Sequence, residues 1–420
     1  MTRTTRSVLP PAFWRLWVGE SVSSFGTYVT LLALQVLVLV TLHGDAEDVG
    51  WLSSARWLPF LVLGLLAGTL VERRRRRPVM VMTDLACAVV LGVIPLAWAL
   101  GWLSLPLLLV IVFLFGTASL INDAASMAFL PRMVPGRQLQ QAHARLDGSD
   151  AVAQTTGPAL SGVLIQLLGA PLAVLVDAGS YLFSAVMMGS LRVEEAVSSG
   201  PTPGAGIRHE IAEGIRWIYR GSSLRALAVG THVWFAANAI LGVAVPTFAL
   251  QTLRLSVLQF SISTTMAGVG AVTGASVTTA VGRRLGTGRT VIAAHTITVV
   301  GVCVMALAGL GTSQWAAAAV LGAGQACHGL AMGMSNSHEM SYRQSLTNDR
   351  LQARTNTTMR AFNRGVIVVV APLAGLLITE IGTRSAIIIA AFIFAVAVAV
   401  LLVSPFRTAD VGPPAQSDDL

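Results

Sequence analysis

AIIIAAFIFAVAVAVLLV, at residues 386–403, is an unbroken run of 18 apolar residues. A helix needs about 20 apolar residues to cross the hydrocarbon layer of a membrane. Similar runs fill most of the sequence, in which 54% of the 420 residues are hydrophobic and 11% are charged. Soluble domains carry charge on roughly a quarter of their residues. We therefore predict a membrane protein.

The breaks between apolar runs predict twelve membrane-spanning helices, at residues 16–42, 50–71, 78–100, 105–130, 147–168, 171–191, 226–250, 257–281, 290–310, 314–339, 361–380 and 385–403. A weak internal repeat lays Gly162, Gly169 and Ala173 on Gly375, Gly382 and Ala386 when the sequence is shifted by 213 residues. Such repeats are typical of transporters that rock one bundle against another. We predict an all-α fold of two pseudo-symmetric six-helix bundles, at 1–191 and 226–405, with a cytoplasmic linker at 192–225 and a cytoplasmic tail at 406–420.

The arginines predict the orientation of the chain. All 28 basic residues are Arg, and the alternating loops place only Arg56, Arg254 and Arg384 on the side opposite the N-terminus. The positive-inside rule then puts both termini in the cytoplasm, at a bacterial inner membrane. The net charge of +8 lies in short loops, which argues against nucleic-acid binding. Three cysteines lie inside apolar runs, so we expect no disulfide framework, metal or cofactor.

The longest polar stretch, 192–225, contains the turn-rich segment SSGPTPG at 198–204. After it, Ile207 to Tyr219 alternates apolar and charged residues at helical spacing. We predict an amphipathic helix here on the cytoplasmic face of the membrane.

A basic loop, GTLVERRRRR at 68–77, joins the second and third predicted helices. It resembles the loop of the major facilitator superfamily, which reads glycine, three residues, an acid, a basic residue, then glycine and two basic residues. Glu72 stands where Asp is usual and Arg75 where Gly is usual. The resemblance implies a gating charge cluster that latches the cytoplasmic side in the outward-facing state, formed by Gly68, Glu72, Arg73, Arg76, Arg77 and Asp123.

Gly157, Pro158 and Gly162 resemble the glycine-proline signature of the superfamily's proton-coupled antiporters, with Ser161 in place of a Gly. Such a helix is thin and kinked, and it can pack tightly where the two halves meet. Three further segments resemble the macrolide-efflux and enterobactin-type siderophore-export branch of the superfamily: LPRMVP at 130–135, LGAP at 168–171, and SYRQ at 341–344 followed by DRLQARTN at 349–356. That branch often has an acid near Thr27, which this chain lacks.

Ionisable side chains at membrane depth are costly, so each is a candidate for function. Glu20 is our first candidate for proton coupling and Asp150 the alternate, although either can instead extend towards the lipid headgroups. Asp177 and Arg56 can form a structural pair. Three histidines in apolar segments are more often packing groups than proton carriers, namely His232, His295 and His328. We expect His338 and Glu339 at the cytoplasmic interface.

Aromatic and amide groups in the central helices are candidates for a substrate cavity: Phe25, Tyr28, Gln35, Phe115, Asn122, Trp234, Phe235, Asn238 and Gln325. A mostly apolar cavity with a few polar groups suits an amphipathic molecule of drug size. Ordinary helix packing is the competing interpretation for each. We predict a single-chain exporter of an antibiotic, other drug or siderophore, exchanged for protons. A facilitator or importer is the alternative, and no catalytic motif supports an enzyme.

Overall fold

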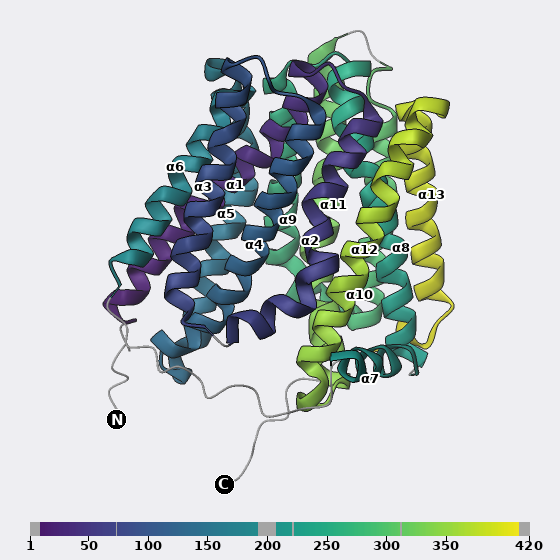
Figure 1. Ribbon diagram of the computed structural model, residues 1–420. Coiled ribbons are helices and arrows are strands. Elements are labelled where there is room, and N and C mark those ends of the chain that lie inside the picture. Colours follow the sequence, from purple (N-terminus) through teal and green to yellow (C-terminus); the bar gives the residue numbers. More distant parts are fainter. Residues whose placement is uncertain (1–8, 73, 192–206, 221, 311–312, 411–420) are drawn as a thin grey trace, which may run out of the picture. The chain divides into compact units, whose positions relative to one another are not determined.

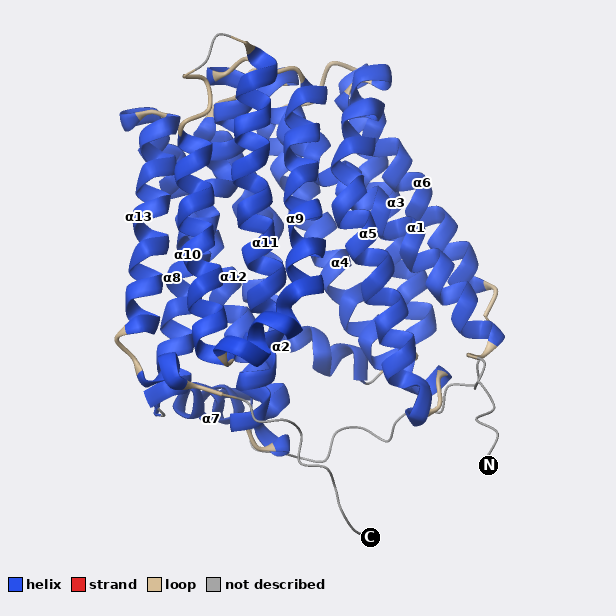
Figure 2. Cartoon of the chain, turned by 180° about the vertical axis from the view of Figure 1, so that it is seen from behind, coloured by secondary structure: helices blue, strands red, loops and turns tan. Residues whose placement is uncertain are grey.

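The structure is a computed structural model that describes residues 9–72, 74–191, 207–220, 222–310 and 313–410, with side chains except at 65–72, 207–211, 222–223, 349–350 and 353. Every regular element in these residues is a helix (Figures 1 and 2). The α-helices are α1 (Pro11–Val36), α2 (Ala46–Glu72), α3 (Arg76–Ala99), α4 (Leu105–Met133), α5 (Gly136–Leu168), α6 (Ala170–Gly189), α7 (Ile207–Arg220), α8 (Ser222–Thr247), α9 (Val257–Leu285), α10 (Thr287–Ala306), α11 (Gln314–Leu346), α12 (Asp349–Ile381) and α13 (Thr383–Leu402).

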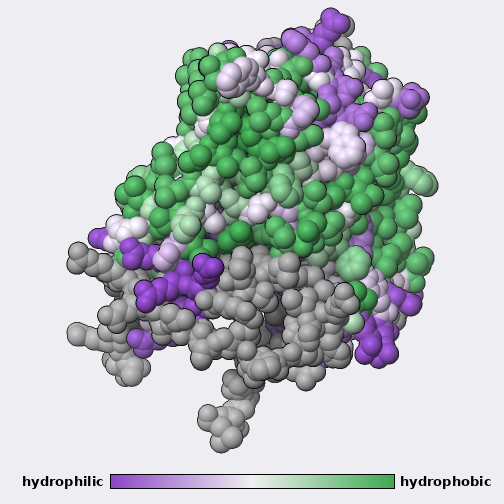
Figure 3. All heavy atoms as spheres, in the orientation of Figure 1, coloured by the Kyte–Doolittle hydropathy of each residue, from purple (hydrophilic) through white to green (hydrophobic). Residues whose placement is uncertain are grey.

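Twelve of the described helices have at least 20 residues, and α7 has 14. Nine of the twelve are long and apolar enough to cross a membrane by length and composition. Large apolar side chains are exposed along them, such as Met82, Leu167 and Phe392. Hydrophobic residues also cover much of the middle of the face in Figure 3. This exposure is expected where lipid, rather than water, surrounds the helices.

Two helices begin much earlier than predicted. α5 starts at Gly136 and α12 at Asp349, each about a dozen residues before the apolar segment that marked it in the sequence. Their first turns are polar, so hydropathy alone does not reveal them. Helical hydrogen bonding continues outside the apolar layer because it needs no hydrophobic surroundings.

The two halves repeat one another in detail. The first long helix of each half ends in a π-helical turn, at Leu37–Thr41 after α1 and at Phe248–Thr252 after α8. Gly169 and Gly382, which the sequence repeat aligns, both have φ near +80° and precede α6 and α13. A left-handed conformation at the same place in each half favours glycine. The pseudo-symmetry predicted from the sequence is therefore visible in the backbone.

The chain divides into two compact units. Unit 1 contains α1, α2 from Ala55 onwards, and α3 to α6, whereas unit 2 contains Gly44–Ser54 and α7 to α13. In unit 1, α1 packs on α5 and α6, and α3 packs on α4 and α6. One of its apolar clusters is centred on Phe13, Met80 and Phe129.

In unit 2, α11 packs on both α9 and α10, and α8 packs on α12 and α13. The start of α2 lies on α12, where Ser54 Oγ donates a hydrogen bond of 2.6 Å to the carbonyl oxygen of Val368. A Cβ added to Gly50 would overlap the carbonyl group of Ala371. Glycine therefore allows the two backbones to approach closely.

Glycines also form the contact between α9 and α11. A Cβ added to Gly270 or Gly274 would overlap a carbonyl oxygen of α11, and one added to Gly329 or Gly333 would overlap a carbonyl oxygen of α9. Small residues at both surfaces let these helices pack backbone to backbone. Glycine is also less hydrophobic than the aliphatic residues, and neither helix is among the nine described helices that are long and apolar enough to cross a membrane.

The predicted amphipathic helix is α7, which packs on α12 and α8. Glu213 forms an ion pair with Arg354 of α12, and Trp217 Nε1 donates to Thr347 Oγ1 at 3.3 Å. Partial burial raises the pKa of Tyr219, whose hydroxyl lies 2.7 Å from Nε2 of His232. The buried side of α7 is thus occupied by protein, and its contact with the membrane stays a prediction. The rest of the predicted linker, at 192–206 and 221, lies outside the described residues.

Candidate functional site

Glu20 of α1 is at the centre of a group of four carboxyl side chains in unit 1, because the other three interact with it electrostatically. Ser126 of α4 donates a hydrogen bond of 3.0 Å from its hydroxyl to Oε1 of Glu20. The carboxyls of Asp84, Asp123 and Asp150 are close enough to interact electrostatically with Glu20. Neighbouring carboxylates in a low-dielectric bundle repel one another unless they share a proton.

Asp84 of α3 was missed in the sequence analysis. It is 2% exposed and accepts hydrogen bonds from the Asn122 amide of α4 and from Ser184 Oγ of α6, the latter at 2.7 Å. Asn122, a predicted cavity residue, therefore binds Asp84. The signal was present in the sequence, because Asp84 is the one acid within the predicted span 78–100.

Replacing Asp84 by leucine is expected to destabilise the protein, because the amide of Asn122 and the hydroxyl of Ser184 would lose their acceptor. Each unsatisfied buried group costs about 1–3 kcal/mol. Asp84→Asn should cost less, since a rotated Asn122 amide can accept the new donor. Thermal unfolding of the purified variants tests this, with the exposed Asp147→Asn as control; equal stability of Asp84→Leu and wild type would show that these bonds contribute nothing.

The predicted helix-five motif packs α5 against α1. Gly157, Pro158 and Gly162 are all buried. A Cβ added to Gly157 would lie 2.6 Å from Cβ of Tyr28, so glycine permits the close approach of the two helices. Ser161 Oγ also donates to the carbonyl oxygen of Tyr28 at 3.3 Å. These contacts lie inside unit 1.

A groove of about 640 Å³ lies between α1 and α5, on the same pair of helices as Glu20 and Asp150. Asp150 is exposed and accepts a hydrogen bond of 3.4 Å from the Tyr28 hydroxyl. The groove is mostly apolar, with a few amide, hydroxyl and guanidinium groups. Its lining consists of Trp17, Ser21, Phe25, Gln141, Ala144, Arg145, Gly148, Ser149 and Val152.

A second buried polar cluster in unit 1 surrounds Asp177 of α6. Asp177 is fully buried, its Oδ1 accepts from Ser180 Oγ at 3.0 Å, and Arg56 of α2 acts on it electrostatically. The guanidinium of Arg56 lies 4.5 Å from the ring centre of Phe115. Phe115, a predicted cavity residue, is itself fully buried. Oδ2 of Asp177 and Nε and Nη1 of Arg56 have no hydrogen-bond partner among the described residues, so the structural pairing considered for Asp177 and Arg56 stays a prediction.

The predicted aromatic candidates of unit 2 form a cluster with a histidine. Trp234 stacks on His328 of α11, with ring centres 5.9 Å apart, and meets Phe235 edge to face at 5.1 Å. Gln325 is buried and donates to Ser263 Oγ of α9 at 3.3 Å. Asn238 on α8 is half-buried, as is Gln35 on α1 of unit 1.

The family model for the Major Facilitator Superfamily matches residues 16–355, which is most of the chain. The chain belongs to this superfamily. It is therefore a multi-pass membrane protein and a secondary transporter rather than an enzyme, as predicted. The superfamily resemblance and the all-α fold drawn from the sequence are confirmed.

Several curated superfamily proteins resemble the chain in sequence. An uncharacterized transporter of the superfamily from Sinorhizobium fredii, y4rN, is 27% identical over 95% of this chain and 96% of its own length. Macrolide efflux protein A of Streptococcus pyogenes is 23% identical over 60% of this chain and 64% of its own length. The multidrug efflux pump Tap of Mycolicibacterium fortuitum is 28% identical over 49% and 51%. The efflux relatives thus match over only about half to two thirds of their length.

Solved structures of other transporters share the fold. A bacterial homologue of the iron transporter ferroportin, in its inward-facing state, superposes with a TM-score of 0.74 over 95% of this chain and 99% of that chain, at 15% identity. The nucleoside transporter NupG, as a D323A mutant, gives a TM-score of 0.76 over 93% and 99%, at 10% identity. At these identities the likeness shows the fold alone.

The predicted gating segment is described only in part. Gly68 and Glu72 end α2 without described side chains, and Arg73 lies outside the described residues. Arg77 donates to the carbonyl oxygens of Met188, at 3.0 Å, and Gly189. Arg77 thus caps the C-terminus of α6, where a cation is favoured. At the neighbouring positions, Arg76 is 3% exposed and Asp123 of α4 is exposed.

Proposed function

We propose that the protein exports an amphipathic small molecule, such as an antibiotic, another drug or a siderophore, in exchange for protons. The observation that carries this proposal is the cluster of carboxyl groups around Glu20, which shares helices α1 and α5 with the groove. Alternating access of the two units would move the substrate across the membrane.

In this proposal the proton gradient supplies the driving force, and proton exchange at Glu20 couples transport to it. Glu20 has a hydroxyl partner in Ser126 and faces three further acids. Such a group gains a proton readily in a dry environment and loses it when water and a cation reach it. Asp150, which binds the Tyr28 hydroxyl, is the alternate carrier. A carboxyl that changes its charge between the two states couples the proton gradient to the movement of the helices.

The chemistry of the groove supports the substrate class. Trp17, Phe25 and Val152 offer apolar surface, whereas Gln141 and Arg145 offer polar groups. A volume of about 640 Å³ falls within the usual range for sites that bind drug-sized molecules. Similarity to macrolide and multidrug efflux proteins favours export over import. The remaining predicted cavity residues, such as Trp234, stay candidates for contact with the substrate.

The arginine distribution supports a bacterial inner membrane with both termini in the cytoplasm. The start of α1, and with it Glu20, then lies in the cytoplasmic half of the bilayer. In this proposal Glu72, Arg76 and Asp123 form the gating latch. A single chain carries out transport, and its partners are the substrate, protons and the lipid bilayer. Opposite charges at membrane depth hold the gate only while they are paired.

Expression in a pump-deficient bacterium tests the direction and the substrate class. Wild type should raise resistance to at least one compound among macrolides, other hydrophobic antibiotics and siderophores, and Asp123→Asn should remove most of that resistance at equal expression. Increased sensitivity or accumulation of the compound in the cells would favour the importer or facilitator instead. The exposed Asp147→Asn is the matched control.

A further inference from the structure

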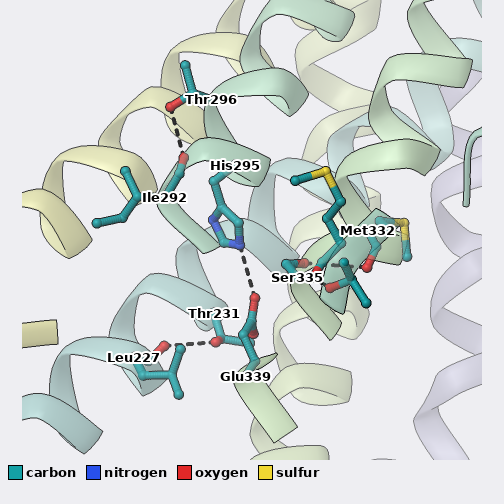
Figure 4. Close-up of polar contacts among 10 residues, drawn as sticks. Leu227, Thr231, Ile292, His295, Thr296, Met332, Ser335 and Glu339 are labelled. Carbon is teal, nitrogen blue, oxygen red and sulfur yellow. Dashed lines mark hydrogen bonds and ion pairs between the residues drawn. The ribbon is translucent and has the colours of Figure 1, made fainter. Parts of the chain in front are cut away.

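Unit 2 contains a buried pair of ionisable side chains. His295 of α10 and Glu339 of α11 lie 3.1 Å apart between Nε2 and Oε1. Figure 4 shows the two side chains pointing towards each other. They are 6% and 18% exposed. Sequence alone does not pair them, because they lie on different helices and the interface is the predicted place of Glu339. Ionisable side chains inside an apolar bundle are costly, so such a pair is a candidate functional site.

The position of His295 repeats that of Asp84. Each is the ninth residue of its helix, Asp84 in α3 and His295 in α10, and these helices hold equivalent places in the two halves. Each also binds a polar side chain of the next long helix, Asn122 for Asp84 and Glu339 for His295. At 1.5 Å per residue, both lie about 12 Å along the helix from its start. Both halves therefore bury an ionisable group at the same depth.

The surroundings of the pair leave room for one exchangeable proton. Nδ1 of His295 is buried and has no hydrogen-bond partner among the described residues. With a proton on Nε2 that is donated to Glu339, the pair carries one net negative charge. An added proton, on Nδ1 or on the carboxyl group, makes the pair neutral overall. Uptake of that proton removes a net charge from the bundle, which burial favours.

Two further ionisable side chains of α11 interact electrostatically with the pair. On α11, His328 acts on His295 and Arg343 acts on Glu339, while Arg360 of α12 acts on Arg343. Apolar residues of the other packed helices lie nearby: Leu227 of α8 and Val398 and Leu401 of α13 cluster with Ile292 of α10, and Val281 of α9 packs against the cluster of Ala294. Arg343 can offset the negative charge of the deprotonated pair.

We propose that His295 and Glu339 together form a second proton-binding site, in unit 2, separate from the carboxyl groups around Glu20. This site would add to the proton-coupled transport proposed above. Its role in the transport cycle rests on that proposal, whereas proton binding by the pair does not. A glycine contact holds α10 and α11 together beyond the pair, since a Cβ on Gly301 would lie 2.7 Å from the carbonyl oxygen of Gly324. The contact between His295 and Glu339 joins the same two helices nearer the start of α10.

Infrared difference spectra of the purified full chain, recorded across about pH 5 to pH 9, test the site without any substrate. We expect a carboxyl band that titrates with pH and that disappears in Glu339→Gln. In His295→Gln the proton concentration at the midpoint of this titration should change at least about tenfold, which corresponds to a loss of about 1.4 kcal/mol of coupling between the two side chains. Exposed residues provide matched controls, Glu380→Gln and His143→Gln, and should leave the band unchanged.

Absence of any titrating band that depends on Glu339 would overturn the proposal, as would a band that is indifferent to His295→Gln in folded protein. The variants should first elute as single species in size-exclusion chromatography. If Glu339→Gln is not folded, Glu339→Asp, which keeps the acid and should move the band rather than remove it, replaces it. Failure of transport in the wild type would count against export but would leave these spectra to decide the site.

Discussion

Glu20→Gln is expected to abolish substrate movement driven by a pH gradient. Glutamine keeps the shape of the side chain and an oxygen that can accept from Ser126, so α1 and α4 should pack as before. It cannot exchange a proton, and transport that depends on this exchange should fall at least about tenfold. Everted membrane vesicles energised by respiration give the rate, with erythromycin as the probe.

Two controls make this result specific. Asp147→Asn removes an exposed acid of α5 and should transport like wild type. Exchange of labelled for unlabelled erythromycin without a gradient should survive in Glu20→Gln, because it needs no net proton movement. Wild-type rates in Glu20→Gln under a gradient would remove Glu20 from the coupling and leave Asp150 as the candidate.

Gly329→Leu is expected to prevent folding. An added Cβ already overlaps the carbonyl group of Ala267 on α9, and backbone atoms cannot move aside as a flexible side chain can. Gly329→Ala should cost about 1–3 kcal/mol or more, the usual range for overpacking, and leucine substantially more. The yield of monodisperse protein and its unfolding temperature are the measurements.

Gly242→Leu is the matched control for Gly329→Leu, because no atom lies within 4 Å of a Cβ built at Gly242. Gly242→Leu should be made in wild-type amounts, with an unfolding temperature close to that of wild type. If Gly329→Leu behaved in the same way, the close approach of α9 and α11 would not hold unit 2 together as described.

The positions of the long helices could be predicted because membrane burial imposes a strong hydropathy signal. The polar starts of α5 and α12 could not, since hydropathy does not report helices outside the apolar layer. The sequence does contain a pattern that predicts the packing of α9 on α11. Gly270 and Gly274, like Gly329 and Gly333, are spaced four apart, which is the pattern of closely packed membrane helices.

The candidate site was only partly predictable. Glu20 stands out as an acid in an apolar helix, and so does Asp84, which was overlooked. Their relation was not visible, because the groups that bind them come from other helices and depend on how these pack. The same holds for His295 and Glu339, which were assigned to packing and to the interface. Residue type predicts that a buried charge needs a partner, whereas the fold decides which partner it has.

Transport by purified protein in liposomes with an acidic lumen tests proton-coupled export most directly. Erythromycin is a weak base that also accumulates passively in an acidic lumen, so liposomes containing Glu20→Gln set the baseline. The account predicts uptake above this baseline together with faster alkalinisation of the lumen, reported by a trapped pH-sensitive dye, and neither effect with a sodium gradient alone. Uptake equal to that of the Glu20→Gln liposomes for erythromycin and for every other compound that confers resistance in cells would contradict it.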